Sequence, residues 1–192
     1  EISECLVGSE MCIRDREIAF HGVEVSWVPQ IYKDTIVCYS FSKSLSLPGE
    51  RLGYVLVPKQ VTDADSVYAA TAGAGRSQGY VNAPSLFQRV AAECCDLTAD
   101  ISVYERNCAL LTDALREMGY HVVQPGGAFY LFPRSLEPDD MAFSERAKKF
   151  DLLLVPGSGF GAPGHFRIAY CVQTEMIERA LPRFKALADS YQ

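Results

Sequence analysis

The sequence predicts an α/β protein that continues into a smaller α+β unit, and three observations support this fold class. Two apolar runs rich in strand-forming residues, 35–39 and 53–58, flank a short loop of Ser, Leu, Pro and Gly. Residues 87–118 carry apolar side chains at steps of three or four, which is the period of a helix. After Gly119, short apolar runs alternate with helical segments. The 192 residues suffice for one or two domains with a sizeable core.

The composition excludes several classes of function. With 48% hydrophobic and 22% charged residues, the chain is typical of a soluble globular protein. A net charge of -6 offers no basic surface, so we expect neither nucleic acid nor an acidic membrane as a partner. No apolar run approaches the roughly 18 residues of a membrane helix. The seven cysteines show no ligand or redox spacing, which predicts reduced thiols in a cytoplasmic protein and no metal site.

The first sixteen residues differ from the rest of the chain. Residues 6–15 show no hydrophobic period, and they read as the translation of a transposon-end adapter used in sequencing libraries. A segment of that origin takes no part in a fold. We therefore expect residues 1–16 to be a non-native, adapter-derived segment that packs poorly, and native sequence to begin at Arg16 or Glu17.

The next elements are predicted in chain order. Residues 17–27 alternate loosely between apolar and polar side chains, which favours an extended connector or a short strand. Residues 61–74 are compatible with a helix whose cap is Thr62 or Asp63. The Gly- and Ser-rich stretch that follows, 73–79, predicts a flexible loop.

A helix start is predicted at residues 82–85, where Pro84 occupies the first turn. The periodic stretch after it predicts one long helix or two abutting helices, with Gly119 as the C-terminal cap. A coiled coil is the alternative, but the charge pattern for it is poor. We place a domain boundary inside this stretch, which separates the remnant of a large domain, 17–98, from a small C-terminal domain, 99–192.

The C-terminal domain is predicted to be a small α+β unit. Its short strands are expected at residues 121–123, 128–132, 152–155 and 166–171. A helix is expected at 141–150, and a final helix is capped by Thr174 and continues despite Pro182.

A lysine stands just past the first apolar run, among residues suited to an anion. Lys43 is preceded by the hydroxyls of Ser40 and Ser42 and followed by Arg51. Lysine is rarely buried without a function, and at such a place it is a candidate nucleophile for a carbonyl carbon. Arginine and small hydroxyls donate the hydrogen bonds that a phosphate needs. These residues predict a phosphate-bearing aldehyde bound to Lys43; the alternative is a strand–loop–strand crossing with a solvated lysine.

The stretch SFSKSLSLPGERLGY, residues 40–54, resembles the lysine motif of the class I/II aminotransferases. These are pyridoxal-phosphate enzymes of fold type I, similar to aspartate aminotransferase. The resemblance covers residues 17–192. It implies the C-terminal part of a fold type I large domain, followed by the small α+β domain. It also implies an amino acid and a 2-oxo acid as substrates, and a homodimer in the full-length parent.

The resemblance implies roles for particular residues. Lys43 would be the catalytic residue, carrying pyridoxal 5'-phosphate and moving the α-proton of the substrate. Ser40 and Arg51 would hold the phosphate, with Ser42 as a further candidate. Arg167 lies inside an apolar strand and would bind the substrate α-carboxylate. An internal salt bridge and an outward-facing arginine are the alternatives for Arg167.

One part of the family pattern is absent from this sequence. The family's Asp-x-x-Tyr segment, which contacts the pyridine nitrogen and the ring hydroxyl, would fall on Cys12 and Asp15. Those roles are not assigned, and we expect aminotransferase activity to be crippled in this fragment. Three rival interpretations remain: a pyridoxal-phosphate lyase or acyltransferase that shares Lys43 and Arg51, the effector domain of a transcription regulator, and an inactive fragment.

Two further patterns favour structural interpretations. Residues 159–164 match G-x-G-x-x-G, but a strand follows and Pro163 lies inside the motif, so we expect a tight loop and no dinucleotide site. In the similar family, a P-G-x-x-F-G loop of this kind precedes the substrate arginine. His21, His121 and His165 share no ligand spacing and are expected to be structural or surface residues.

Overall fold

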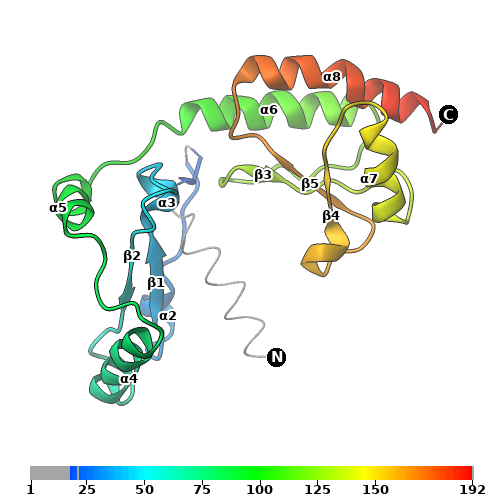
Figure 1. The fold of residues 1–192 in the computed structure, drawn as a ribbon. Coiled ribbons are helices and arrows are strands. Elements are labelled where there is room, and N and C mark those ends of the chain that lie inside the picture. Colours follow the sequence, from blue (N-terminus) through cyan, green and yellow to red (C-terminus); the bar gives the residue numbers. More distant parts are fainter. Residues whose placement is uncertain (1–17, 21, 192) are drawn as a thin grey trace. The chain divides into compact units, whose positions relative to one another are not determined.

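The structure is a computed structural model that describes residues 18–20 and 22–191. The chain divides into two compact units between Asp100 and Ile101, and each is described by itself (Figure 1). The sequence places the domain boundary between residues 98 and 99. The expectations for residues 1–16 and for His21 lie outside the described residues.

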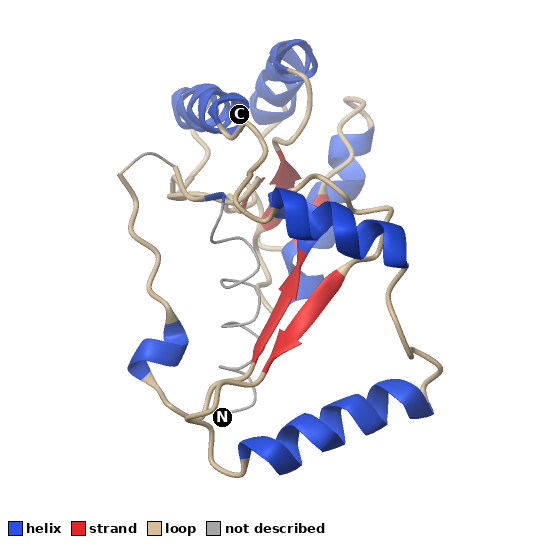
Figure 2. Cartoon of the chain, turned by 90° about the vertical axis from the view of Figure 1, so that its left-hand side faces the viewer, coloured by secondary structure: helices blue, strands red, loops and turns tan. Residues whose placement is uncertain are grey.

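The first unit is built on an antiparallel pair of strands (Figure 2). Strand β1 (Val37–Ser40) pairs with β2 (Gly53–Leu56), from Val37 opposite Leu56 to Ser40 opposite Gly53. Helix α2 (Val28–Ile31) precedes them, and the short helix α3 (Phe41–Ser44) directly follows β1. The two predicted strands are therefore present, although both are shorter than the apolar runs that predicted them.

Two longer helices complete the first unit, α4 (Ala64–Ser77) and α5 (Ser85–Cys94). The predicted loop at 73–79 is wrong over its first part, because α4 continues to Ser77. Its last turn is closed by the hydroxyl of Ser77, which donates to the carbonyl of Gly73 at 2.9 Å. The two glycines in this turn lower helix propensity without ending the helix.

The strand pair leaves much apolar surface exposed. All four residues of β2 are exposed, among them Tyr54 at 46%, Val55 at 45% and Leu56 at 40%. A two-stranded sheet by itself buries little and is marginally stable. The first unit therefore carries the strands of an α/β core without the layers that would cover them among the described residues.

The second unit packs two long helices on a small antiparallel sheet (Figure 1). The helices are α6 (Ser102–Glu117) and α8 (Thr174–Asp189). The strands are β3 (Tyr130–Leu131), β4 (Val155–Pro156) and β5 (Phe166–Ala169), in the order β3–β5–β4. Helix α7 (Asp140–Lys148) and the 3₁₀ turn η2 (Gly157–Phe160) flank β4. Fully buried side chains from all layers form the core: Leu111, Leu115, Leu131, Phe143, Phe166, Tyr170 and Leu187.

The periodic stretch folds as two helices, α5 and α6, with residues 95–101 between them. Two helices are one of the two predicted arrangements, but they do not abut, because residues 95–101 separate them. Gly119 ends α6 as predicted, with a φ of 88° that suits glycine. Tyr120 N–H donates to Leu115 at 3.0 Å and Gly119 N–H to Arg116 at 3.0 Å, the hydrogen bonds of a Schellman cap.

Several predicted strands of the second unit are wrong in extent. Residues 121–123 form no strand, and the expected runs 128–132 and 152–155 shrink to β3 and β4. Proline cannot donate to a ladder, and Pro133 and Pro156 limit these strands. Ala128, with a φ of 64°, interrupts the extended backbone before β3.

The final helix continues through Pro182 as predicted, but Thr174 is its first residue and not its cap. The Thr174 hydroxyl instead donates to Oδ1 of Asn107 at 2.8 Å. Asn107 is fully buried on α6, and its amide donates to the carbonyls of Tyr170 at 3.0 Å and Val172 at 2.8 Å. One side chain therefore joins α6 to the turn between β5 and α8.

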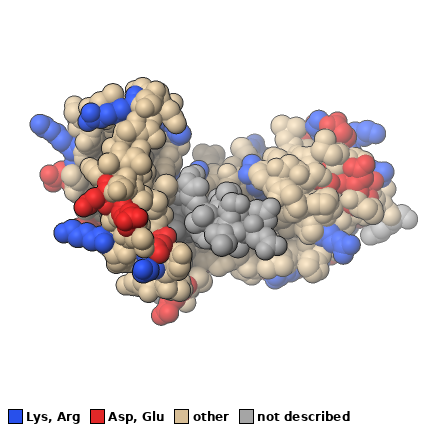
Figure 3. All heavy atoms as spheres, turned by 90° about the horizontal axis from the view of Figure 1, so that it is seen from below, with Lys and Arg blue, Asp and Glu red and all other residues tan. Residues whose placement is uncertain are grey.

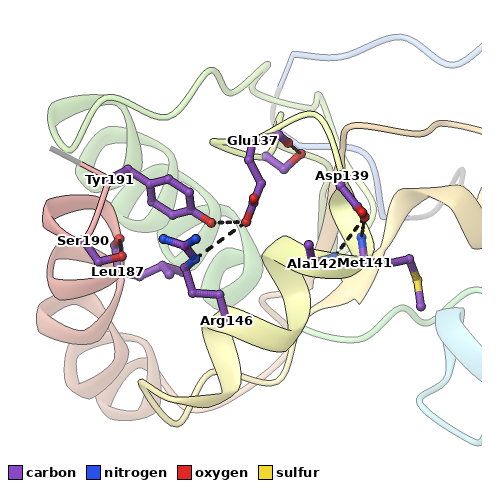
Figure 4. Close-up of polar contacts among 9 residues, drawn as sticks. Glu137, Asp139, Met141, Ala142, Arg146, Leu187, Ser190 and Tyr191 are labelled. Atoms are coloured by element: carbon purple, nitrogen blue, oxygen red, sulfur yellow. Dashed lines mark hydrogen bonds and ion pairs between the residues drawn. The ribbon is translucent and has the colours of Figure 1, made fainter.

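The end of the chain is joined to α7 by polar contacts (Figure 4). The hydroxyl of Tyr191 donates to the Glu137 carboxylate, and the Arg146 guanidinium lies 4.3 Å from the Tyr191 ring centroid. Burial, and then the contact with Glu137, raises the pKa of Tyr191 above its usual range. Asp139 caps α7 by accepting from Met141 N–H and Ala142 N–H.

Candidate active site

Lys43 lies in a single helical turn directly after β1, where the sequence predicts a loop. The turn is fixed locally, because the Ser40 hydroxyl accepts from Ser42 N–H at 3.3 Å and donates to the Ser42 hydroxyl at 2.9 Å. Serine in this role is a common helix cap. Lys43, Ser40 and Ser42 are all half-buried. The backbone therefore places the amine and both hydroxyls within one turn.

Gly53 brings the opposite strand close to this turn. A Cβ atom at Gly53 would lie 2.3 Å from the carbonyl oxygen of Tyr39, a distance that only glycine avoids. The pairing continues one step further, since Phe41 N–H donates to Leu52 at 3.0 Å. Arg51 directly precedes Leu52 in the turn before β2, so this hydrogen bond sets the Arg51 backbone at the end of the hairpin that carries Ser42 and Lys43.

Arg51 has a strained backbone. Its φ of 54° lies in the left-handed region, which costs a residue with a side chain about 1 kcal/mol. Its side chain is exposed, and Nη1 donates to the carbonyl of Pro48 at 2.9 Å. A strained backbone conformation of this kind persists where the surrounding structure holds it in place. Here the close pairing of Gly53 with Ser40, two residues after Arg51, is the neighbouring constraint.

The four side chains at this end of the hairpin suit a phosphate and a carbonyl. The Ser40 and Ser42 hydroxyls and the Arg51 guanidinium are donors to anionic oxygen atoms. The Lys43 amine is the nucleophile for a carbonyl carbon. The residues present therefore fit a phosphate-bearing aldehyde. Tyr39 and Tyr54 stack at 4.9 Å beside them and give this end of the hairpin an aromatic side.

Arg167 belongs to the second unit, in the middle of β5 and next to the fully buried Phe166. Its guanidinium carbon lies 4.5 Å from the ring centroid of Tyr130 and 4.4 Å from that of Phe160. No carboxylate within residues 18–20 and 22–191 lies at ion-pair distance from Arg167. The internal salt bridge is therefore absent from the described structure, and the cation is held against two aromatic rings.

The loop before β5 is held by a buried carboxylate that the sequence did not indicate. Asp140, at the start of α7, accepts from the Ser158 N–H at 2.7 Å and from the Ser158 hydroxyl at 2.6 Å. These hydrogen bonds, the hydroxyl one foremost, hold the pKa of Asp140 below its usual range. Gly157 is required in this loop, since a Cβ there would lie 2.2 Å from the carbonyl oxygen of Ala162.

His121 and His165 share a cavity of about 610 Å³ with Arg134, although the sequence treats both histidines as isolated. The pairing of Arg134 with His165, and the hydrogen bond from Arg134 N–H to His121, bring them together. Among the described residues, no three His, Cys, Asp or Glu side chains lie close enough to hold a metal ion. Cys94, Cys95, Cys108 and Cys171 are free thiols.

Charged side chains of both signs are interspersed on the face in Figure 3, where Lys, Arg, Asp and Glu occur over both units. This agrees with the modest net charge of -6. No helix within the described residues has the length and apolar character needed to cross a bilayer.

Solved structures identify the fold. An aminotransferase from Eubacterium rectale is 51% identical with a TM-score of 0.90, over 93% of this chain and 45% of that one. The aspartate aminotransferase of Thermotoga maritima, 23% identical, has a TM-score of 0.79 over 92% of this chain and 46% of its own. The chain thus has the aspartate aminotransferase-like fold of type I transferases, as the sequence predicts.

Residues 19–184 match the family described as aminotransferase class I and II. Among curated relatives, aspartate aminotransferase of Geobacillus stearothermophilus is 30% identical over 81% of this chain and 41% of its own length. Aromatic-amino-acid aminotransferase 2 of Thermococcus litoralis is 30% identical over 96% of this chain and 51% of its own. The chain belongs to the class I and II aminotransferase family. It spans about half the length of these relatives.

Proposed function

We propose that the full-length protein transfers an amino group between an amino acid and a 2-oxo acid, with pyridoxal 5'-phosphate bound through Lys43. The observation that carries the proposal is the donor set at one end of the β1–β2 hairpin: Ser40, Ser42, Lys43 and Arg51. Family membership supports the same reaction. By resemblance, the full-length protein is a cytoplasmic homodimer.

The residues of the hairpin have separate tasks in this proposal. Ser40, Ser42 and Arg51 hold the phosphate through charge-assisted hydrogen bonds. The Nζ atom of Lys43 carries the aldehyde at rest and, during the reaction, moves a proton to and from the substrate α-carbon. When bound, the cofactor supplies an aldehyde to accept the amino group and a ring that takes up the charge developing at the α-carbon.

Arg167 binds the α-carboxylate in this proposal. Two rings flank its guanidinium, while the N–H donors in the guanidinium plane remain suited to a planar, bidentate partner. The absence of a described internal carboxylate partner favours this role. The counterparts of the ring-contacting Asp and Tyr fall on Cys12 and Asp15, outside the described residues, so the activity is proposed for the full-length protein.

An assay of the full-length protein tests the proposal. It is incubated with pyridoxal phosphate, an amino donor and a 2-oxo acid, and all products are identified. We expect a new amino acid and a new 2-oxo acid in equal amounts, loss of both in Lys43→Ala, and retention in Lys59→Ala, an exposed lysine of the same unit. If the amino acid is cleaved or acylated and no amino group is transferred, the protein is instead a lyase or an acyltransferase.

A further inference from the structure

Asp140 is a buried carboxylate that accepts hydrogen bonds and has no cationic partner among the described residues. It is 3% exposed, and no Lys or Arg of the described chain lies within ion-pair distance of it. Its oxygens accept from the hydroxyl and N–H of Ser158 at 2.6–2.7 Å, and more weakly from Gly164 N–H at 3.4 Å. A buried carboxylate is tolerated only with such donors, so its place depends on the loop that supplies them.

The donors come from both ends of one loop. Ser158 lies in η2, directly after β4, and Gly164 lies two residues before β5. The loop is also closed at its base, where Gly157 N–H donates to His165 at 2.7 Å. Asp140, reaching from α7, therefore fastens the η2 turn to a separate element of the unit.

The side chain that this loop presents is Phe160. Its ring lies against the Arg167 guanidinium at 4.4 Å and meets the Phe132 ring edge-on at 6.2 Å. Phe160 is 48% exposed, so burial alone does not hold the ring in place. The backbone of the η2 turn sets the position from which the ring reaches Arg167 and Phe132, and Ser158 lies only two residues before Phe160.

Two aromatic rings lie against Arg167, one from each side of its strand β5. Tyr130 approaches from β3, and Phe160 approaches from the turn after β4, while β5 lies between these strands. The pair of rings restricts the guanidinium to orientations in which its N–H edge points away from both of them. Losing one ring would free the side chain to rotate, because a long arginine side chain has many rotamers.

We propose that Asp140 and Ser158 form a latch that positions Phe160 against Arg167 and so fixes the guanidinium for a carboxylate ligand. The proposal rests on the function proposed above, which assigns the substrate carboxylate to Arg167. Asp140 is a positioning residue in this account, since it acts through the η2 turn. The ligand class is a 2-oxo acid or an amino acid.

The latch is tested first without ligand, by NMR of the full chain. Because the Phe160 ring lies 4.4 Å from the Arg167 guanidinium carbon, we expect it to shift the side-chain proton signals of Arg167 in addition to the shift from Tyr130; the signals are assigned with Arg167→Lys. We expect this ring-current shift to be lost in Asp140→Asn, as in Phe160→Leu, and reduced in Ser158→Ala, which keeps the backbone N–H donor. Asp139→Asn is the matched control: the neighbouring carboxylate caps α7 by accepting from Met141 N–H and Ala142 N–H (Figure 4), and among the described residues no hydrogen bond or ion pair joins its side chain to η2.

The link to the ligand is tested by titrating the same chains with 2-oxoglutarate. We expect Asp140→Asn to raise the Kd at Arg167 about tenfold, since a misplaced guanidinium loses its bidentate contact, and Asp139→Asn to leave it unchanged. An unaltered Arg167 signal in Asp140→Asn would overturn the latch. A lost ring shift with an unchanged Kd would overturn its effect on binding.

The two proposals fail in different ways. If the unaltered chain and Arg167→Lys bind 2-oxoglutarate with the same Kd, the role of Arg167 in the proposed function is wrong. The NMR signals without ligand still show whether Asp140 and Ser158 position Phe160 against Arg167. If Asp140→Asn does not fold, Ser158→Ala decides, because it removes only the hydroxyl contact. An unchanged ring shift in Ser158→Ala would then count against the latch.

Discussion

At the scale of single residues, Gly53 allows the close strand pairing that places Arg51 at the same end of the hairpin as Lys43. Its missing Cβ lets the strands pair at Ser40, and that pairing brings Arg51 toward the lysine turn. We expect Gly53→Ala to destabilise the unit by about 2 kcal/mol, because the added carbon meets backbone rather than a movable side chain. Urea unfolding, followed by the fluorescence of Trp27, measures the loss.

Gly49 provides the matched control for this substitution. A Cβ at Gly49 would meet no atom within 4 Å, so Gly49→Ala should change the free energy of unfolding by less than about 0.5 kcal/mol. Equal effects of the two substitutions would contradict the role given to Gly53.

The carboxyl of Asp140 gives a prediction for pH. Its pKa in the folded chain lies below the ordinary value of 3.8, because hydrogen bonds from Ser158 favour the ionised form. The stability it contributes is therefore present above pH 3.8 and is lost as the pH falls through the lower folded value. Thermal unfolding between neutral and acidic pH should show a shallower acid decline in Asp140→Asn; parallel declines would contradict this assignment.

The sequence indicates some of the candidate site residues and gives no sign of others. Ser40, Lys43 and Arg51 lie within one continuous motif that resembles the family's lysine motif, so they could be proposed as site residues from the sequence. The roles proposed for Asp140 and Phe160 depend on contacts with residues of other elements, and these contacts depend on the pairing of β4 with β5. A single sequence carries no signal of that pairing.

At the scale of elements, Asn107 joins α6 to the turn between β5 and α8. Asn107→Ala removes three hydrogen bonds and leaves two carbonyls and a hydroxyl without that partner. We expect a loss of about 3 kcal/mol from the free energy of unfolding, against about 1 kcal/mol for Thr174→Ala, which removes one of the bonds. Chemical denaturation compares the two, and equal losses would show that Asn107 does not act through the carbonyls.

The elements also show where sequence patterns are reliable. Helix α6 was predictable, because its apolar period is long and Gly119 marks its end. The short strands were not, because two residues of ladder carry no period, and Pro133 and Pro156 restrict the pairing. Helix α4 continues past Gly73 and Gly75 to Ser77, because backbone hydrogen bonds and the Ser77 hydroxyl stabilise its last turn. Helix propensities do not include these hydrogen bonds.

At the scale of the whole molecule, the two units differ in how well they bury their strands. In the first unit, β2 is exposed along its length, whereas in the second unit Leu131 and Phe166 are fully buried. Strands with little buried surface open at low free energy. We therefore expect amides of β1 and β2 to exchange with deuterium much faster than those of α6 and α8.

Hydrogen exchange of the full chain, read by mass spectrometry, measures this difference. Peptides from the second unit serve as the internal reference under identical conditions. Protection of residues 37–56 equal to that of residues 102–117 would contradict the account, because it would require a cover on β2 that the described residues do not supply.

Covalent trapping shows whether Lys43 is the residue that binds pyridoxal phosphate. The 192-residue chain is mixed with pyridoxal phosphate, reduced with borohydride to fix any lysine–aldehyde bond, and mapped by peptide mass spectrometry. We expect one dominant label on Lys43, which is lost in Lys43→Ala, weakened in Arg51→Ala and retained in Lys59→Ala. Labelling spread evenly over exposed lysines, with Lys43 no more reactive than Lys59, would contradict it.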